Sequence, residues 1–479
     1  MLVKRCIAVA YAAIVLFGIA TVSPASAAMT STAPVAFDTS GFGNVDSDPG
    51  QISCWSPGNC AAVGYIRDVM GSGNRIPFVA ISTNGVWSAP FEIAFPSGIV
   101  NGDAWLKVVS CTADSNCAAA GIYQDQAGDD QGFVALGFGP IWTLGQPFTF
   151  GGSVGPTQYL QVNSIDCAGN LDCSIVGQVT TNFDPHAYVI NSVGGSFGTA
   201  QIIDFPVGVP HVPNDSLEAV SCAEPGGCTA IGYMSPGGGN QDRIFSISSS
   251  SGVWGIPEFL PFGTGFGGGL TSDISCPTLT NCTTGGWTYG PNSTIRAWIA
   301  VHSSSGWSVQ IVDTPSDGGG SSPWQVINSV SCSTVAVCIA AGRYLDSTGT
   351  NGFLLTTTDG WATFTYTAVA GNANGVSCTP SGPCLAVVGE NNDFLQGFGG
   401  REWTTPLQIS SPSGITDPSV DSLSCTNDGV CGVFAYGDNL SIGSNYAAYA
   451  FFVTVGTDPI PTTTTTTTSD QPVAPAFTG

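Results

Sequence analysis

Short apolar segments separated by turn-forming residues run along most of the chain. The first group of four lies at 51–54, 60–65, 77–82 and 87–93. Each segment has 4 to 7 residues, with Val, Ile, Ala and aromatic side chains bounded by Gly, Asn, Asp, Ser or Pro. This pattern is typical of β-strands joined by turns, and no stretch has the periodicity of a helix. The sequence therefore predicts an all-β protein.

The group of four segments recurs eight times, and each copy contains two cysteines with five residues between them. First cysteines are 46 to 57 residues apart. This period, with four strands in each of eight repeats, predicts an eight-bladed β-propeller over 28–457. An open solenoid is the alternative. We number the repeats 1 to 8 in chain order. Their cysteine pairs are Cys54/Cys60, Cys111/Cys117, Cys167/Cys173, Cys222/Cys228, Cys276/Cys282, Cys332/Cys338, Cys378/Cys384 and Cys425/Cys431.

The two ends of the repeat array complement each other. Repeat 8 has a third segment that ends at Val455, and no fourth segment follows it. Residues 33–37, Ala-Pro-Val-Ala-Phe, resemble the fourth segments at 89–93 and 405–409. We expect this N-terminal strand to complete the last blade, which would leave no open sheet edge.

The first 27 residues have the features of a secretory signal peptide. Lys4 and Arg5 precede an apolar run at 7–20, and the small residues 25–27 follow. A membrane anchor is the alternative, but the run is shorter than the roughly 20 residues of a membrane span. Cleavage would remove Cys6 and leave 16 cysteines, all in pairs. We therefore expect an extracellular protein with no transmembrane span in the mature chain.

The paired cysteines lie at the end of one predicted strand and the start of the next, at the neck of a hairpin. In an exported chain such pairs usually form disulfides, here one for each repeat. A metal site would need two pairs to converge, and the motif contains no histidine. We expect each disulfide to contribute roughly 2 kcal/mol, because it closes only a short loop.

The charge balance limits the class of partner. The chain has 9 Lys and Arg against 33 Asp and Glu, a net charge of −24. Nucleic-acid binding needs a basic surface and is excluded. Charged residues make up 9% and hydrophobic residues 43% of the chain, which excludes a charged disordered chain or a coiled coil. We expect a monomer whose partner is an extracellular glycan or protein.

Two small residues recur at fixed positions in the repeats. A serine precedes the first cysteine in seven repeats, and Asp166 takes its place in repeat 3. A nucleophile would be unique within an active site, so we assign these serines a structural hydrogen bond in each blade and predict no catalytic residue. A glycine four residues after the second cysteine, found in six repeats, is expected at a packing or bulge position.

A turn that ends in an aromatic residue separates the third and fourth segments. Its clearest copies are 82–87, Ser-Thr-Asn-Gly-Val-Trp, and 357–364, Thr-Thr-Asp-Gly-Trp-Ala-Thr-Phe. This turn resembles a degenerate Asp-box of the sialidase-like (BNR) propellers, with the aspartate retained only at Asp359. In that family the turn stabilises the fold on the face opposite the active site, so the resemblance implies a fold and no activity.

Loops between second and third strands vary in length, whereas the loops between paired cysteines are constant. In a four-stranded blade these two kinds of loop lie on opposite faces, and variable loops on a rigid scaffold usually carry the binding site. A role in solvating the surface is the alternative. The candidate binding residues are Arg67, Asp68, Arg75, Asp125, Asp129, Asp130, Asp184, Arg243, Arg296, Arg343 and Asp346.

Residues 75–77, Arg-Ile-Pro, match a sialidase motif whose arginine binds a carboxylate. Arg243 and Arg296 begin third strands in other repeats and could complete an arginine triad. However, no nucleophilic tyrosine with an acidic partner can be assigned. A glycoside hydrolase or lyase of the sialidase-like type is therefore the alternative function.

The sequence gives little support for a metal or cofactor site. His186, His211 and His302 lie in different repeats and lack the spacing of metal ligands. Residues 125–130, Asp-Gln-Ala-Gly-Asp-Asp, resemble a calcium-binding loop in composition but lack its Asp-x-Asp-x-Asp-Gly spacing. We expect no cofactor, with calcium at this loop as the alternative.

The C-terminal 458–479 form a Thr- and Pro-rich tail with seven consecutive threonines at 462–468. Such a segment cannot bury apolar surface and should be an extended stalk. The final residues resemble part of a wall-sorting signal and suggest association with the cell wall. The sequence predicts a secreted or cell-surface module that recognises a glycan or protein through its variable loops without catalysis. A structural role in the cell envelope is a further alternative.

Overall fold

The computed structural model describes residues 29–37, 45–68, 73–96, 100–151, 157–209, 212–237, 242–291, 294–313, 324–347, 349–380, 382–400, 402–439 and 445–456. The elements of this part are β-strands, and most pair as antiparallel neighbours along the chain. The predicted all-β class is therefore confirmed. The predicted signal peptide, 1–27, and tail, 458–479, lie outside the described residues.

Repeats 1 to 4 each form one five-stranded sheet whose outermost strand is split into two short pieces. Repeat 1 contains β3 (Val45–Ser56), β4 (Asn59–Asp68), β5 (Arg75–Thr83), β6 (Val86–Trp87) and β7 (Phe91–Glu92). Repeat 2 contains β8 (Val100–Cys111), β9 (Asn116–Asp125), β10 (Asp130–Phe138), β11 (Ile141–Trp142) and β12 (Gln146–Pro147). Repeat 3 contains β13 (Thr157–Ala168), β14 (Asp172–Thr181), β15 (Asp184–Val193), β16 (Ser196–Phe197) and β17 (Gln201–Ile202). Repeat 4 contains β18 (Val212–Glu224), β19 (Gly227–Ser235), β20 (Arg243–Ser250), β21 (Val253–Trp254) and β22 (Glu258–Phe259).

Repeats 5 and 6 form two four-stranded antiparallel groups, which a single parallel bridge between Ile295 and Trp324 joins into one sheet. Their strands are β23 (Gly267–Thr278), β24 (Asn281–Tyr289), β25 (Ile295–Ser303) and β26 (Gly306–Ile311), then β27 (Trp324–Cys332), β28 (Cys338–Asp346), β29 (Gly349–Thr357) and β30 (Thr365–Val369). Repeat 7 contains β31 (Asn372–Cys378), β32 (Cys384–Gly389), β33 (Phe394–Phe398) and β34 (Leu407–Gln408).

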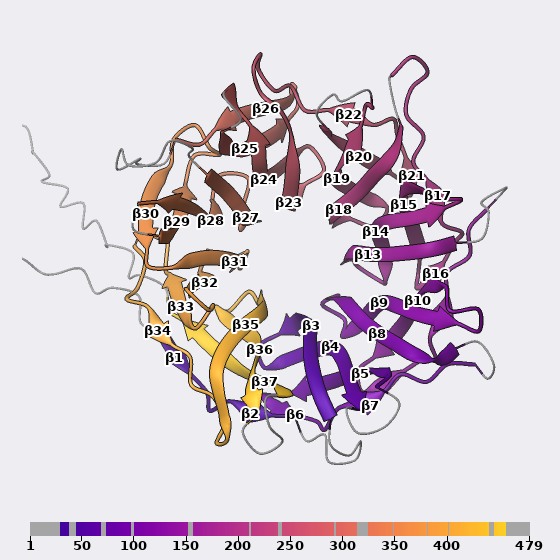
Figure 1. Cartoon of the computed structure of the whole chain (residues 1–479). Coiled ribbons are helices and arrows are strands. Elements are labelled where there is room, and N and C mark those ends of the chain that lie inside the picture. Colours follow the sequence, from indigo (N-terminus) through magenta and orange to yellow (C-terminus); the bar gives the residue numbers. More distant parts are fainter. Residues whose placement is uncertain are drawn as a thin grey trace, which may run out of the picture.

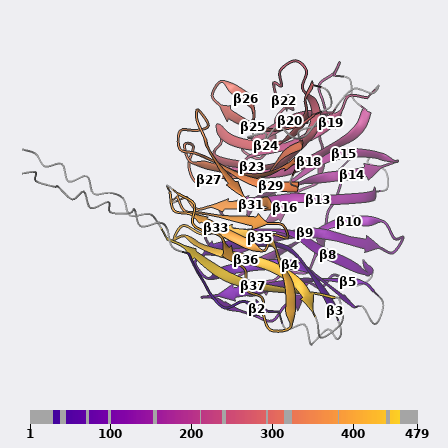
Figure 2. The ribbon, with the colours of Figure 1, turned by 60° about the vertical axis from the view of Figure 1, so that its left-hand side comes forward.

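The last sheet combines the two ends of the described chain. Its strands are β35 (Ile415–Cys425), β36 (Val430–Asn439), β37 (Asn445–Val455), β1 (Met29–Ser31) and β2 (Val35–Ala36). Val35 pairs with Ala450 and Met29 pairs with Val455, so the N-terminal segment supplies the outer strand of repeat 8. Figure 2 shows β2 beside β37. The N-terminal strand predicted at residues 33–37 therefore completes the last sheet.

The sheets stand around a common centre, and the first strand of every repeat lies innermost (Figure 1). Eight apolar clusters fill the spaces between neighbouring sheets. One of them packs Phe78 of repeat 1 against Phe434 and Phe452 of repeat 8. The core is therefore divided among the contacts between sheets, and the last sheet packs on the first.

A closed circle of hydrogen bonds joins the innermost strands. The side chain before the first cysteine of each repeat accepts a bond from the cysteine N–H of the next repeat. The donor–acceptor pairs are Cys111/Ser53 (3.0 Å), Cys167/Ser110 (3.1 Å), Cys222/Asp166 (2.7 Å), Cys276/Ser221 (3.1 Å), Cys332/Ser275 (3.0 Å), Cys378/Ser331 (3.0 Å), Cys425/Ser377 (3.1 Å) and Cys54/Ser424 (3.0 Å). These bonds satisfy N–H groups on the free edge of each innermost strand.

The circle assigns the repeated serine a structural role, as the sequence predicts, but with a different partner. The sequence suggests a bond within each blade, whereas the bond crosses to the neighbouring repeat. The reason is that the N–H groups left without a ladder partner lie at the ring centre, beside the preceding repeat. Asp166 replaces serine by using Oδ2 for Cys222 N, while its Oδ1 accepts bonds from Cys167 N and Ser110 Oγ.

Each cysteine pair forms a disulfide between the first and second strands of its repeat, as predicted. The bonds are Cys54–Cys60, Cys111–Cys117, Cys167–Cys173, Cys222–Cys228, Cys276–Cys282, Cys332–Cys338, Cys378–Cys384 and Cys425–Cys431, with Cα atoms 3.9 to 4.0 Å apart. The turn between the third and fourth strands lies beside the disulfide loop, since Gly85 N donates to Gly58 O at 2.8 Å and Gly252 N to Gly226 O at 2.8 Å. We call this side of the ring the disulfide end. The opposite side, where second and third strands connect, is the hairpin end.

The two cysteines of a pair lie opposite each other at the neck of the hairpin, as predicted, but they differ in burial. The first cysteine is half-buried in seven repeats, whereas the second is only 0 to 2% exposed in all eight. Each second cysteine also belongs to a different one of the eight apolar clusters. These residues are Cys60, Cys117, Cys173, Cys228, Cys282, Cys338, Cys384 and Cys431.

The second strand lies between its neighbours within the sheet, so its residues face the adjoining sheets. A Cβ atom at Gly432 of repeat 8 would lie only 3.0 Å from Cys60 Sγ, and Ser174 of repeat 3 contacts Cys228 Sγ at 3.2 Å. The disulfide thus packs on the preceding repeat. Cys60, Cys117, Cys282 and Cys431 are therefore core residues.

The glycine after the second cysteine allows close approach of the innermost strand. A Cβ atom at Gly232 would lie 1.9 Å from Ser216 O, and one at Gly177 would lie 2.0 Å from Gln161 O. The pairing of the first and second strands shifts register next to these positions. The predicted packing and bulge role of this glycine is therefore confirmed.

Candidate binding surface at the hairpin end

The structure places the candidate residues near the connections between second and third strands, spread over six repeats. Arg67 and Arg75 face each other across β4 and β5. Asp125, Asp129 and Asp130 lie at the β9–β10 connection. Asp184, Arg243 and Arg296 lie at the starts of β15, β20 and β25, and Arg343 and Asp346 lie in the last part of β28. The side chain of Asp68 lies outside the described residues. The candidates thus share one end of the ring without forming one compact site.

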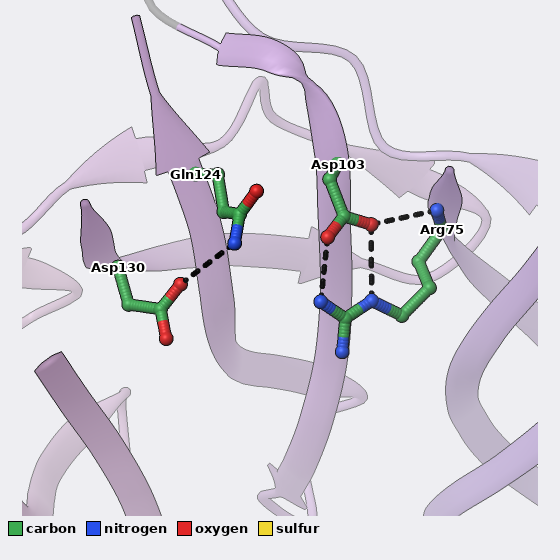
Figure 3. Close-up of polar contacts among 4 residues, drawn as sticks. All are labelled: Arg75, Asp103, Gln124 and Asp130. Atoms are coloured by element: carbon green, nitrogen blue, oxygen red, sulfur yellow. Dashed lines mark hydrogen bonds and ion pairs between the residues drawn. The ribbon is translucent and has the colours of Figure 1, made fainter. Parts of the chain in front are cut away.

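Arg75 is hydrogen-bonded to Asp103, as Figure 3 shows. Its backbone N, Nε and Nη2 donate to the carboxylate of Asp103 at 2.7, 3.0 and 2.5 Å. Asp103 belongs to β8, so this ion pair joins repeats 1 and 2. The guanidinium carbon also lies 3.4 Å from the ring centre of Trp105, a cation–π contact. Arg75 is therefore held rigidly between a carboxylate and an aromatic ring.

The Arg75 ion pair decides the ionisation of Asp103. Burial alone opposes the charged form, but the hydrogen bonds and charge of Arg75 outweigh it and lower the Asp103 pKa. The side chains of Arg75 and Asp103 are 24% and 15% exposed. Asp103 is thus a carboxylate whose two oxygens are already occupied.

Arg67 and Tyr65 extend this group along β4. The guanidinium carbon of Arg67 lies 5.9 Å from the Tyr65 ring centre, and Arg67 forms no ion pair with another residue of the described chain. The Tyr65 hydroxyl donates to Asp48 Oδ2 at 2.5 Å. Burial and the Asp48 carboxylate raise the Tyr65 pKa, so the phenol stays protonated. We call Tyr65, Arg67, Arg75, Asp103 and Trp105 the Arg75 cluster.

A groove of about 230 Å³ borders the Arg75 cluster. Arg75 forms part of its wall, with Ile76 and Pro77 from the same strand and Phe95 from the connection to repeat 2. The Phe95 ring packs against Phe133, with ring centres 4.7 Å apart. The groove therefore places a fixed cation beside apolar and aromatic surface, with the carboxylate of Glu92 also in its wall.

The acidic loop at 125–130 is a closed turn. Asp125 Oδ1 accepts bonds from the N–H groups of Ala127 at 2.8 Å and Asp129 at 3.1 Å. Asp130 accepts a bond from Gln124 Nε2 at 3.3 Å, and burial raises its pKa. In the described part of the chain, no group of three or more His, Cys, Asp or Glu residues is arranged to hold a metal ion.

The remaining arginines have separate local partners. Arg243 lies 3.5 Å from the Phe259 ring centre, Arg343 lies 4.9 Å from that of Trp324, and Arg296 pairs with Asp313. β5 lies across the ring from β20 and β25 (Figure 1). The arginine triad considered from the sequence is therefore not assembled, because Arg75 stands in repeat 1, across the ring from Arg243 and Arg296 in the adjoining repeats 4 and 5.

Sequence reasoning missed two sets of polar and aromatic residues. One is an aromatic residue five positions after the second cysteine. It occurs in four repeats, as Tyr65, Tyr233, Trp287 and Tyr436. The other lies on the innermost strands, where Lys107 Nζ approaches Asn163 Oδ1 at 3.5 Å. Burial lowers the Lys107 pKa, and the charge of Glu218 opposes this shift. Aligning the repeats on their cysteines would have revealed the aromatic set.

The histidines add nothing to the site. His186 lies in β15 and His302 in β25, whereas His211 lies outside the described residues. His302 packs against Trp307, with ring centres 5.1 Å apart. The described ranges also contain no helix that is long and apolar enough to cross a membrane.

No protein-family model matches the chain, and no curated protein matches it in sequence. Among solved structures it is similar to an ulvan lyase, with 11% identity over 76% of this chain and 95% of that chain at a TM-score of 0.42. It is also similar to a protein of unknown function from Dyadobacter fermentans, with 9% identity over 89% and 99% at 0.42. A third is an α-L-arabinanase of Penicillium chrysogenum, with 13% identity over 61% and 92% at 0.36. Identities this low carry no information on substrate.

Proposed function

We propose that the chain is an eight-bladed β-propeller that recognises a glycan through its hairpin end without catalysis. The Arg75 cluster is the observation that carries this proposal. It is the place where a rigid cation, an arginine that forms no ion pair with another described side chain, and two aromatic rings meet beside a groove. Sugars are bound by aromatic faces together with a few fixed polar groups, and this cluster offers both.

The blade count and the turn at 357–364 belong to the same proposal. The closed circle of eight hydrogen bonds at the ring centre supports eight blades. In the turn, Thr357 Oγ1 donates to Asp359 Oδ1 at 2.9 Å, and Thr363 N donates to the same oxygen at 2.9 Å. These bonds support a degenerate Asp-box, whose role is to stabilise the disulfide end.

The non-catalytic role rests on the state of Asp103. A carboxylate that acts as nucleophile or general base needs a free oxygen, but Arg75 engages both oxygens of Asp103. The hydroxyl of Tyr65 is likewise bonded to Asp48. The groups best placed for chemistry are therefore used to fix the binding surface.

One observation favours a glycosidase as the second candidate. The pKa of Asp130 is raised, mainly by burial, while that of Asp103 is lowered. A carboxyl group whose pKa is raised by burial is what a general acid requires. Released sugars detected by mass spectrometry, and lost in Asp130→Asn, would establish this alternative.

Export and attachment complete the proposal. Eight disulfides are typical of proteins that fold in an oxidising compartment. We propose a monomeric, cofactor-free protein outside the cell, with residues 1–27 as its signal peptide and 458–479 as a stalk. Sequencing the N-terminus of the secreted protein tests the signal cleavage directly.

The recognition role can be tested with an array of neutral and acidic glycans. The strongest ligand is then titrated against wild type, Arg67→Gln and Arg243→Gln. Both variants lose one positive charge, but Arg243 lies across the ring from the Arg75 cluster. We expect Arg67→Gln to weaken binding about tenfold, since it removes charged hydrogen bonds, and Arg243→Gln to have little effect. Equal loss in both variants would show that only net charge matters.

A further inference from the structure

A second recess lies far from the hairpin end, between repeats 6 and 7. It has a volume of about 570 Å³ and opens between β29 and β30 on one side and β33 with the turn after it on the other. In Figure 1 these strands lie at the outer edge of the ring. The turn at 357–364 contributes to its wall, and Gly360 N donates to Ala336 O in the disulfide loop of repeat 6. The recess therefore belongs to the disulfide end.

Threonine hydroxyls form much of its lining, so we call it the threonine cleft. Its wall includes Thr356 and Thr358 and, along β30, Thr365 and Thr367. Thr356 Oγ1 accepts a bond from Trp403 Nε1 at 3.2 Å. Within the described chain, Thr358, Thr365 and Thr367 use their hydroxyls for no hydrogen bond. Each of these hydroxyls can both donate to and accept from a ligand.

A buried amide also lines the cleft. The Gln396 residue is 6% exposed, and its Nε2 donates to Thr404 O at 2.7 Å. This bond fixes the orientation of the amide. The Oε1 atom has no hydrogen-bond partner in the described part of the chain. A buried acceptor without a partner costs free energy. A small shift of the Gln396 side chain toward the cleft would let a ligand hydroxyl donate to Oε1 and recover that cost.

Aromatic rings supply the apolar part of the wall. Phe364 and Trp403 are half-buried, and Phe398 lies behind Trp403 with ring centres 5.3 Å apart. None of the lining residues that the structure describes is basic, and Glu402 contributes an exposed carboxylate. The described lining thus combines hydroxyls, an amide oxygen, aromatic faces and one carboxylate, with no cation among these residues.

We propose that the threonine cleft binds a neutral saccharide. Sugar hydroxyls match the threonine hydroxyls and Gln396 Oε1, and the C–H faces of the sugar ring match Phe364 and Trp403. The volume lies within the roughly 300–1,000 Å³ of ligand pockets and suits a mono- or disaccharide. An anionic sugar would meet the carboxylate of Glu402, and none of the described lining residues offers a compensating cation.

A peptide added as a strand beside β30 is the competing occupant. Strand addition depends on backbone hydrogen bonds and is insensitive to side-chain hydroxyls. The orphaned acceptor and the free hydroxyls of the cleft are side-chain groups. These observations favour the saccharide.

Calorimetric titration with neutral mono- and disaccharides and the matching uronic acids tests the proposal. Thr365→Val/Thr367→Val removes two hydroxyls and keeps the side-chain shape. Thr454→Val is the matched control, because Thr454 is an exposed threonine on β37. We expect a neutral saccharide to bind, the double variant to bind it roughly tenfold more weakly, and the control to bind as wild type.

Gln396→Leu provides a second variant, accompanied by thermal unfolding to show that it folds. It should also weaken saccharide binding. The proposal is overturned if no neutral saccharide binds, if the uronic acids bind more tightly, or if the double variant and the control behave alike. Binding of threonine-rich peptides with unchanged affinity in the double variant would assign the cleft to strand addition.

Discussion

The two ends of the ring differ in how much they vary from repeat to repeat. At the disulfide end every repeat has the same disulfide geometry and the same side chain-to-backbone bond to its neighbour. At the hairpin end the residues that face each other differ in every sheet. In repeats 1, 2, 4 and 5, the paired residues of the second and third strands nearest their connection are Arg67/Arg75, Gln124/Asp130, Met234/Arg243 and Tyr289/Ile295.

This difference separates stability from recognition. A contact that occurs in all eight repeats stabilises the ring but cannot distinguish one part of the surface from another. A contact that is not repeated, such as the combination of the Arg75–Asp103 ion pair with the stacking of Arg75 on Trp105, gives the ring a distinct place for a ligand. The disulfide end should therefore respond to substitution mainly through stability, and the hairpin end mainly through binding.

Reduction of the disulfides should have the largest effect. Each bond closes a short loop, and the chain-entropy relation gives roughly 2 kcal/mol per bond. Guanidinium unfolding with and without a reductant measures the combined loss, and Cys54→Ala/Cys60→Ala measures one bond together with the packing of the buried Cys60. An unchanged unfolding midpoint after complete reduction would contradict the role assigned to this end.

Asp166→Ser should reduce the loss of unfolding free energy between pH 4 and pH 7 by an amount on the order of 2 kcal/mol. Burial raises the Asp166 pKa to about 6, despite the hydrogen bonds that this carboxylate accepts. Between the ordinary carboxyl pKa near 4 and this value, the folded protein binds more protons than the unfolded chain. Stability should therefore fall as pH rises from about 4 to about 6.

Serine is the natural replacement because the other seven repeats carry it at this position. Asp166→Ser keeps an acceptor for Cys222 N and removes the titrating group. Denaturant unfolding at pH 4 and pH 7 compares the two proteins. A difference between the two pH values as large in the variant as in wild type would assign the pH dependence to other carboxyls.

The disulfides and the closing strand could be predicted because cysteines and apolar segments recur at regular spacing along the sequence. Eight identical cysteine pairs and the likeness of 33–37 to other fourth segments need no knowledge of three-dimensional contacts. The serine circle could not be predicted in full. The serine recurs visibly, but its partner is a backbone N–H in the next repeat, which the sequence does not mark.

The burial of the second cysteines also escapes the sequence. The spacing places Cys60 and Cys431 beside a turn, in the same way as Cys54 and Cys425. Only the packing of one sheet on the next encloses the second cysteine of each pair. The pairing of residues is thus a local property of the repeat, whereas their burial is a property of the ring.

The Arg75 cluster could be predicted only in part. Arg67 and Arg75 are recognisable as loop charges, whereas Asp103 and Trp105 are not, because they lie on the innermost strand of the next repeat. Long-range contacts between neighbouring sheets decide which of many surface charges are held rigidly. Those contacts depend on the twist and spacing of the sheets and leave no local pattern.

Ser53→Ala should cost about 1.5 kcal/mol, since it leaves the N–H of Cys111 without a partner at the free edge of β8. Ser304→Ala is the control, because Ser304 is exposed in a turn of repeat 5. Guanidinium unfolding should separate the two variants, while both should bind glycan as wild type does. Loss of binding in Ser53→Ala without loss of stability would break the division between the two ends.

Arg75→Gln should have the smallest effect on stability, about 1 kcal/mol or less at pH 7, because the ion pair is partly exposed. Its pH dependence should have the opposite sign to that of Asp166. Arg75 holds the Asp103 pKa below its ordinary value, so the stabilisation is present above pH 4 and is lost as pH falls through the folded pKa. Wild type and Arg75→Gln should therefore differ at pH 7 and converge in strongly acidic solution, as measured by denaturant unfolding at pH 7 and pH 3. A constant difference at both pH values would mean that Arg75 stabilises the hairpin end by packing on Trp105 and that its charge contributes nothing.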